Sequence, residues 1–129
     1  MSKLSLLQRE RRLAAIARFE TFLKKYPDNT KYTPDALFRL AELYFEQSED
    51  DHLAKQEKYD ELQASFDEGK LKVEPVPPEK DFRKTIALFE RLITKWPDYR
   101  AVDGAHYLKG FCLKVMGKDE RAKESFQVL

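Results

Sequence analysis

The sequence predicts an all-α protein built from repeated pairs of antiparallel helices. The first observation is an internal repeat: the segment 15–28, AIARFETFLKKYPD, returns without a gap as 85–98, TIALFERLITKWPD. Both copies carry apolar residues at helical spacing and end at a Pro-Asp pair. The second observation is composition, because 4 Gly and 6 Pro in 129 residues are few for the many turns of a small β-sandwich or barrel. Repetition of this kind indicates the architecture before any residue is assigned a role.

The charge balance argues against two classes of partner. The chain has 24 Lys and Arg residues against 23 Asp and Glu residues, so no overall field favours nucleic acid or an anionic membrane. We interpret one local basic cluster as a solvated helix face; it comprises Lys3, Arg9, Arg11 and Arg12. No segment reaches the ~20 apolar residues of a membrane-spanning helix, and no signal peptide is visible, so we expect no direct membrane insertion.

The first helix is predicted from Leu4 to about Lys25. Its apolar residues recur at three- and four-residue steps, which is typical of a helix packed on one side. The stripe comprises Leu13, Ile16, Phe19 (or Glu20) and Leu23. The sequence YPDN at 26–29 ends the helix, because proline cannot continue the hydrogen-bond ladder and disfavours helical geometry in the residue before it.

The second helix is predicted from Thr33 to about Gln47. Thr33 is the expected capping residue, and Pro34 suits the first helical position because its missing N–H costs nothing there. The buried stripe comprises Leu37, Leu40, Ala41 and Tyr44. The acidic run 48–51, SEDD, is either a helix break with a new cap or an exposed turn of a continuing helix, and we favour the break.

Residues 48–80 are predicted to be an insert. A polar helix is expected over about 51–67, and Gly69 ends it. Its apolar stripe comprises Tyr59, Leu62 and Phe66. The segment 70–80, KLKVEPVPPEK, is predicted to be an extended connector, because its prolines prevent a helix and stiffen the chain.

Three helices are predicted after the connector. The repeated helix runs over about 79–95, the next over about 102–116, and the last begins near residue 119. Gly117 is expected to cap the middle one, since glycine tolerates the left-handed conformation at a helix C-terminus. Their apolar residues are Ile86, Phe89, Leu92 (or Glu90) and Ile93; then Ala105, Leu108, Cys112 and Val115; then Ala122 and Phe126. We interpret Cys112, the only cysteine, as a buried structural thiol.

This order of elements resembles the tetratricopeptide repeat, a helix–turn–helix unit of about 34 residues whose second helix carries Ala-x3-Phe and a later Pro. The signature stands at Ala15, Phe19 and Pro27, again at Thr85, Phe89 and Pro97, and in shortened form at Ala122 and Phe126. We therefore divide the single repeat domain, residues 1–129, into a partial first unit (1–28), a middle unit (33–98) and a last unit (102–129). The insert at about 48–80 lengthens the middle unit by about 32 residues relative to the usual repeat.

Departures from the usual pattern distinguish this chain within the family it resembles. The Trp position of the repeat holds Leu37 and His106, and Lys109 replaces the usual Leu, so the last unit is degenerate. The turn after each repeat proline is about three or four residues longer than usual. A long YPD turn followed by xDAxxxLAxxY is similar to the bacterial cell-envelope branch, such as the outer-membrane assembly lipoprotein, Tol–Pal coordinators and motility-associated repeat proteins. The resemblance favours a bacterial periplasm or envelope, and nothing else in the sequence identifies the compartment.

The resemblance implies a right-handed α-α superhelix, a solenoid in which neighbouring helix pairs share a core. The first helix of each pair would line a concave groove for a protein or peptide partner. The implied groove positions are Asp35, Phe38, Glu42 and Phe45 in the middle unit and Gly104, Tyr107, Phe111 and Lys114 in the last. Four of these residues are aromatic, and they either form an apolar binding surface or are covered by neighbouring repeats or by the insert.

The sequence offers no catalytic site. It has no nucleophile elbow, phosphate-binding glycine loop or dinucleotide fingerprint, so we predict a protein that is not an enzyme and needs no cofactor. Metal binding is not expected, because His52 and His106 lie far apart without a ligand spacing around them. A carboxylate-binding groove of the chaperone-adaptor type would need Lys, Asn and Arg where this chain has Phe38, Glu42 and Gly104.

The sequence therefore predicts a non-catalytic scaffold for protein–protein interaction, with an envelope or motility-associated setting favoured. Two alternatives stay open. One is a regulatory domain attached to a catalytic domain outside this chain. The other is self-association through apolar residues near the two ends, which are Leu4, Leu6, Leu7, Phe126, Val128 and Leu129.

Overall fold

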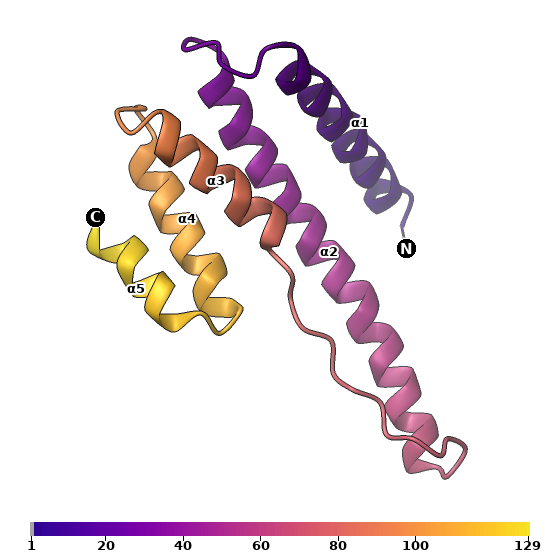
Figure 1. Cartoon of the computed structure of the whole chain (residues 1–129). Helices are drawn as coiled ribbons and strands as arrows, with labels where there is room; N and C mark the ends of the chain where they lie inside the picture. The colour runs from indigo at the N-terminus through magenta and orange to yellow at the C-terminus, as the bar shows by residue number, and fades with distance from the viewer. Residues whose placement is uncertain (1) are drawn as a thin grey trace.

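The computed structural model describes residues 2–129, which form five α-helices and no β-strand. They are, in chain order, α1 (Lys3–Lys25), α2 (Thr33–Asp67), α3 (Arg83–Lys95), α4 (Val102–Val115) and α5 (Asp119–Gln127). Each helix runs antiparallel to the one before it and packs against it (Figure 1). The predicted all-α repeat architecture is confirmed.

Helix α1 begins and ends where the sequence predicts. Ser2 caps its N-terminus, because the side-chain oxygen of Ser2 accepts a hydrogen bond from the backbone N–H of Ser5 at 3.1 Å. Ile16 and Leu23 are buried in the core that α1 shares with α2. The apolar face predicted for this helix therefore exists in its C-terminal half.

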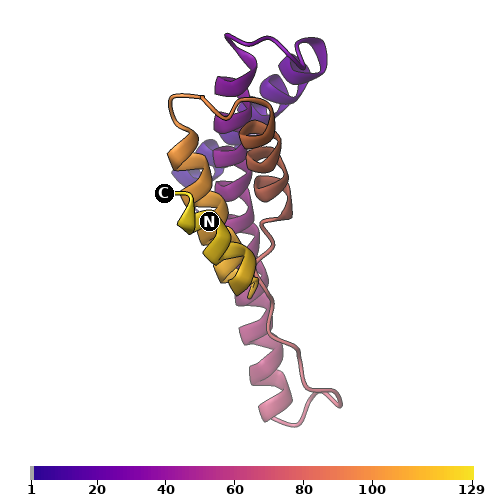
Figure 2. The ribbon, with the colours of Figure 1, turned by 60° about the vertical axis from the view of Figure 1, so that its left-hand side comes forward.

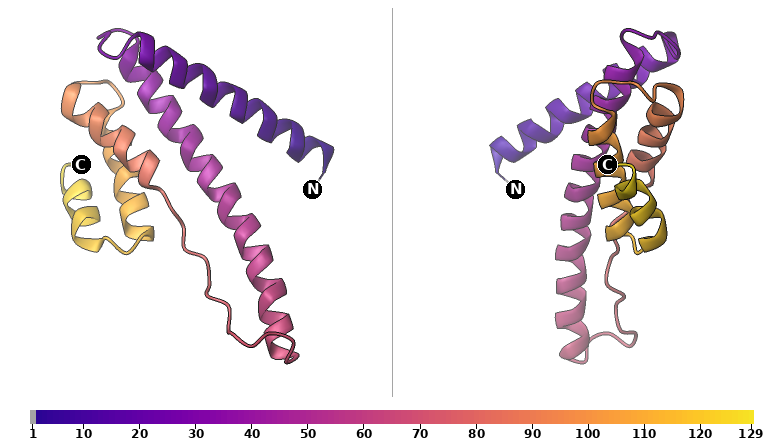
Figure 3. Two further views of the ribbon diagram at one scale, coloured as in Figure 1. Left: turned by 45° about the vertical axis from the view of Figure 1, so that its right-hand side comes forward. Right: turned by 90° about the vertical axis from the view of Figure 1, so that its left-hand side faces the viewer.

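The predicted stripe is wrong at Leu13, which is exposed. Arg12 takes the place next to α2, where its guanidinium pairs with Asp50 and its side chain is only 14% exposed. The N-terminal half of α1 splays away from α2 (Figure 3). An ion pair therefore links the two helices at this level, where the sequence predicts an apolar contact.

Helix α2 begins at Thr33, but this threonine does not cap it as expected, since the capping position belongs to Tyr32. The Thr33 hydroxyl instead donates to the carbonyl of Tyr26 at 2.6 Å and accepts from the N–H of Asn29 at 2.9 Å. These two bonds tie the turn after α1 to the start of α2. Pro34 lies in the first turn, as predicted.

The predicted helix break at 48–51 is wrong, because α2 continues without interruption to Asp67. Two residues of this run find ion-pair partners far away in the sequence. Asp50 pairs with Arg12, and Glu49 pairs with Lys80 at 3.1 Å. These carboxylates bind groups outside the helix and do not cap a new one.

The insert forms a protruding arm, which we define as the distal part of α2 (51–67), the turn at 68–69 and the extended connector 70–80. The arm projects beyond α3, α4 and α5, and the connector returns alongside α2 (Figure 2, Figure 3). Gly69 at the tip has φ of 78°, a conformation that favours glycine. The extended connector is confirmed, whereas the separate helix predicted for the insert is part of α2.

Helix α3 begins at Arg83 and not near residue 79 as predicted. Lys80 is still paired with Glu49 of α2, and Phe82 is fully buried in the core. Helix α3 therefore begins after these two contacts, which fix the end of the connector and the position of Phe82. Helices α4 and α5 lie where predicted, except that Val115 at the end of α4 is exposed.

Two apolar clusters hold the helices together. The larger joins α1, α2, α3 and the start of α4, and it contains Leu37 and Phe89. The smaller joins α3, α4 and α5, and it contains Phe82 and Leu113. Cys112 is buried in the smaller cluster, which confirms its interpretation as a structural thiol. Neither cluster contains a residue of the arm. The cluster residues that flank the arm in the sequence are Phe45 and Phe82.

Candidate partner-binding surface

The predicted groove positions lie on α2 and α4, which meet at two places along their length. Near the start of α4, a Cβ atom added at Gly104 would lie 3.4 Å from Cζ of Phe38. Further along, the rings of Phe45 and Phe111 are 6.1 Å apart. The structure thus brings residues of both helices to one surface, although their side chains differ widely in exposure.

Phe38 is half-buried and packs between α3 and α4. Its ring meets that of Phe89 edge-on, with centroids 5.3 Å apart, and lies 6.2 Å from the ring of Tyr99. Gly104 leaves room for it on the α4 side. Phe38 therefore contributes to packing between the helices as well as to the surface.

Phe45 is also half-buried. Its ring stacks on Phe82 with centroids 4.9 Å apart and an angle of 15° between the ring planes. Phe82 comes from the segment just before α3, so the covering side chain belongs to the middle unit itself. The arm points away from this surface (Figure 2) and does not cover it.

A hollow of about 260 Å³ opens between α2 and α4, and we call it the α2–α4 groove. It is lined by Glu42, Phe45, Glu46, Phe89 and Leu108. Its floor is apolar, and both carboxylates of the lining come from α2. Glu46 and Leu108 are absent from the positions expected from the sequence. The spacing of Glu46, four residues after Glu42 on the same helical face, could have identified it.

Two predicted residues of α4 lie toward α5 instead. Tyr107 is 55% exposed, and its ring lies 6.1 Å from that of Phe126. Lys114 lines a separate open hollow with residues of α5. Phe111, at 37% exposure, lies between this face and Phe45. The predicted set therefore spreads over two adjoining faces of α4.

Asp35 is held by the turn between α3 and α4. The hydroxyl of Tyr99 donates to its Oδ1 at 2.5 Å, and Arg100 pairs with the same oxygen at 2.7 Å. The hydrogen bond from Tyr99 is the largest cause that lowers the pKa of Asp35, while burial is the largest cause that raises the pKa of Tyr99 to about 12. Asp35 thus connects α2 to the next unit.

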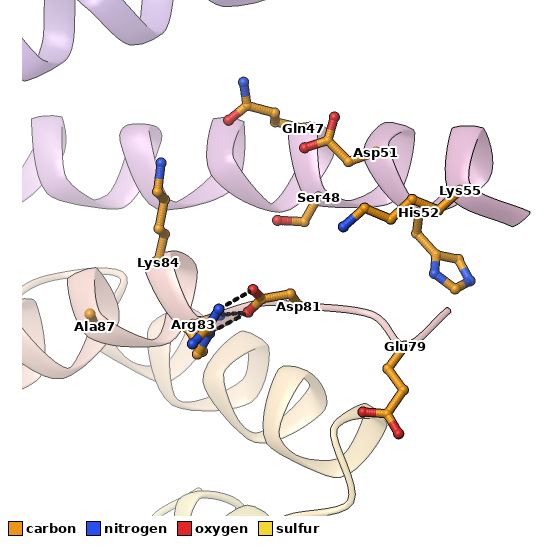
Figure 4. A pocket seen from close by; sticks show the side chains of 10 residues that line it. All are labelled: Gln47, Ser48, Asp51, His52, Lys55, Glu79, Asp81, Arg83, Lys84 and Ala87. Atoms are coloured by element: carbon orange, nitrogen blue, oxygen red, sulfur yellow. Dashed lines mark hydrogen bonds and ion pairs between the residues drawn. The ribbon is translucent and has the colours of Figure 1, made fainter. Parts of the chain in front are cut away.

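A polar cavity of about 500 Å³ lies at the base of the arm, between α2 and the start of α3 (Figure 4). Asp81 and Arg83 pair there at 2.7 Å, and hydrogen bonding from Arg83 lowers the pKa of Asp81 to about 2. His52 and Ser48 reach the cavity from α2.

Residues 2–129 contain no group of three or more His, Cys, Asp and Glu side chains placed to hold a metal ion. None of the helices in this range combines the length and the apolar character required to cross a membrane. His106, half-buried on α4, has a lowered pKa mainly because burial disfavours its charged form.

Comparison with known proteins gives one match. A model of the tetratricopeptide repeat family matches residues 35–99, half of the 129-residue chain. The matched stretch begins on α2, includes the arm and ends just after α3. Neither a curated protein nor a solved structure matches the chain.

Proposed function

The chain belongs to the tetratricopeptide repeat family, and we propose that it is a scaffold whose α2–α4 groove binds a segment of a partner protein. Repeats of this family are generally protein–protein interaction modules, and the family is typically non-catalytic. The proposal assigns the partner to one surface of this chain.

The observation that carries the proposal is the chemistry of the α2–α4 groove. Phe45, Phe89 and Leu108 form an apolar floor, and Glu42 and Glu46 supply two carboxylates on one side. A hollow of about 260 Å³ accommodates one or two apolar side chains of an extended or helical segment. A Lys or Arg of that segment would pair with the carboxylates and fix its orientation.

The other predicted residues take supporting roles in this proposal. Phe111 extends the apolar floor beside Phe45, and Tyr107 and Lys114 flank it toward α5. Asp35 and Phe38 position α2 against the next unit through their contacts with α3, α4 and the turn between them.

A photo-crosslinking residue at position 111 tests the groove in the source cell. We expect a specific crosslinked protein from Phe111 and none from an equivalent substitution at Val76, an exposed residue of the arm. Glu42→Lys with Glu46→Lys should abolish the product, because the reversed charges repel the basic residue of the partner. The matched control is Glu57→Lys with Glu61→Lys, two exposed positions on the arm that receive the same change of charge.

Circular dichroism melts of these variants show whether the fold is retained. Loss of the crosslink with an unchanged melting temperature supports the groove. Equal loss in the arm control would contradict it, since only the total charge would then matter.

A second candidate function is self-association through the ends of the array. The observation behind it is the exposure of apolar side chains at both ends, including Leu4 at 65% and Val128 at 60%. A contact between unlike ends would be heterologous and could form chains of molecules. Sedimentation velocity over a wide range of concentrations tests this idea, and a monomer at the highest concentration would reject it.

We also propose a bacterial envelope or motility-associated setting for the whole protein. Its support is the long YPDN turn followed by the motif that begins at Pro34. Fractionation of cells that express the tagged full-length protein tests the setting, and exclusive recovery in the cytosol would contradict it.

A further inference from the structure

We propose that the open side of α1 binds an acidic amphipathic helix of a partner protein, in the same way that α3 holds α2 within this chain. This surface, the α1–α2 groove, is an open hollow of about 330 Å³. It is lined by Phe19, Phe22, Tyr32, Asp35, Ala36 and Arg39. It lies apart from the α2–α4 groove, so the proposal does not depend on the function proposed above.

The internal repeat supplies the template for this helix. Phe19 and Phe22 of α1 correspond to Phe89 and Leu92 of α3 in the gap-free alignment of 15–28 with 85–98. Phe89 and Leu92 are fully buried, and the ring of Phe38 from α2 meets Phe89 edge-on. Phe19 and Phe22 are only half-buried. The same apolar helix face thus occurs twice. Helix α2 covers it on α3, whereas on α1 it is only partly covered.

The position of the hollow agrees with this template. In the repeat register, Asp35 and Arg39 of α2 correspond to Gly104 and Leu108 of α4. Gly104 contacts Phe38 of α2, and Leu108 faces α2 across the α2–α4 groove. The α1–α2 groove therefore corresponds to the space that α2 itself fills between α3 and α4.

The charges around the groove indicate an acidic occupant. Arg11, Ala15, Arg18 and Phe22 follow one another at helical spacing and share one side of α1. Arg11 and Arg18 are exposed. On the other wall, Arg39 pairs with Glu42 at 3.6 Å, and the lining residue Asp35 is already bound by Tyr99 and Arg100. Helix α1 as a whole has seven basic and two acidic residues. Its open side therefore presents apolar contacts bordered by positive charge.

The occupied copy has the same balance of net charge, although no ion pair found in residues 2–129 joins α3 to the acidic side chains of 33–47. Helix α3 has four basic residues and one acidic residue. The part of α2 that packs on it, residues 33–47, has three acidic residues and one basic residue. A second copy of α1 would bring positive charge against positive charge, which disfavours self-pairing through this face.

The test uses a labelled peptide with the sequence of residues 33–48, the part of α2 that packs on α3. A lactam bridge between positions 39 and 43 holds the peptide helical. The bridge lies away from the side that α2 presents to α3. Fluorescence anisotropy then measures its binding to the intact chain. We expect saturable binding that Arg11→Glu with Arg18→Glu weakens by about tenfold or more, because the change from two positive to two negative charges at the rim repels the acidic probe. A probe with Phe38→Ala should bind more weakly than the unmodified probe.

The matched control is Lys58→Glu with Lys72→Glu, which makes the same change of charge at exposed positions of the arm. This variant should bind the probe within about twofold of the wild type, given the short range of surface charges in salt. Circular dichroism confirms that each variant keeps its helix content. Equal affinity of the α1 variant and the wild type would overturn the proposal, and so would equal weakening by both variants.

Sedimentation of the chain without the probe separates a partner from a second copy. A monomer at the concentrations used for binding supports a partner helix. A dimer that Arg11→Glu with Arg18→Glu dissociates would overturn the proposal, because the occupant would then be another copy of this chain.

Discussion

Gly110 and Gly104 lie on the same helix, yet the space around each residue is different. A Cβ atom at Gly110 would lie 2.5 Å from Cε1 of Phe126, far inside van der Waals contact. A Cβ atom at Gly104 would lie 3.4 Å from Cζ of Phe38, an ordinary contact. Only Gly110 is therefore required by the close approach of α4 and α5.

We predict that Gly110→Ala lowers the free energy of unfolding by about 1–3 kcal/mol, because Phe126 and α5 must shift to admit the methyl group. Gly104→Ala should be neutral or stabilising by up to about 1 kcal/mol, since alanine is the better helix former. Urea denaturation of both variants measures the difference. Equal effects would mean that helix propensity, and not the approach of α5, governs these positions.

The stability of the folded chain depends on pH in part through the ionisation of Asp81. The hydrogen bonds that Asp81 accepts from Arg83 lower its pKa to about 2 in the folded protein, from an ordinary value of 3.8. A lowered folded pKa means that the ionised carboxylate stabilises the fold above about pH 4. This contribution is lost as the pH falls from about 4 to 2. The side chains of Arg83 and Asp81 are 81% and 49% exposed, so the contribution of this pair to stability is small and salt weakens it further.

Asp81→Asn should therefore lower the melting temperature at pH 6, and its difference from the wild type should close between about pH 4 and pH 2. The same difference should shrink in 1 M salt, where the Debye length is about 3 Å. Calorimetry at several pH values measures it, with Asp98→Asn as an exposed control. A difference that stays constant over this range would show that the charge of Asp81 does not contribute.

At the scale of elements, helix ends were predictable where a local signal exists. Prolines follow the ends of α1 and α3, and Gly117, with φ of 77°, follows α4. The continuity of α2 was not predictable, because Arg12 and Lys80, which pair with its acidic run, are far away in the sequence. The pattern of residues around the acidic run does not show which distant residues will lie beside it in the fold.

The candidate surface shows the same limit. Helical spacing places Phe38 and Phe45 on one face of α2, as the sequence predicts. How far each ring is covered depends on Phe89 and Phe82, which reach α2 only after the chain has traversed the arm. The sequence thus predicted the helix face but not its exposure.

The arm can be removed as an element. Deletion of residues 53–77, with a short Gly-Ser linker, should leave the helical spectrum of the remaining chain and a cooperative melt, because both apolar clusters lie outside the deleted segment. Near-ultraviolet circular dichroism and thermal unfolding measure the outcome. A molten product with helix but no fixed aromatic signal would show that the arm stabilises the core.

At the scale of the whole molecule, each helix packs mainly on its neighbours in the sequence. Stability is then a sum of local interfaces, and parts of the array can open separately. The nine-residue α5 depends on the smaller cluster alone. The end of the chain at α5 is therefore expected to open more easily than the middle.

Hydrogen exchange tests this expectation. Amides of α5 should exchange faster than those of α3, and Leu113→Ala should accelerate exchange in α5 while α1 and the first half of α2 keep their protection. The substitution removes a fully buried side chain from the smaller cluster, at a cost of about 2–5 kcal/mol. Equal acceleration throughout residues 2–129 would indicate a single cooperative unit.

One side of the arm is helical and the other is extended, and their different rise per residue constrains how the length of the arm can change. The helical side advances about 1.5 Å per residue, and the extended connector advances about 3.1 Å per residue. Because the connector returns beside α2 and is fastened to it by Lys80 and Glu49, both sides must span the same length. Natural insertions and deletions should therefore occur as linked changes, with about two residues gained or lost in the helix for each one in the connector.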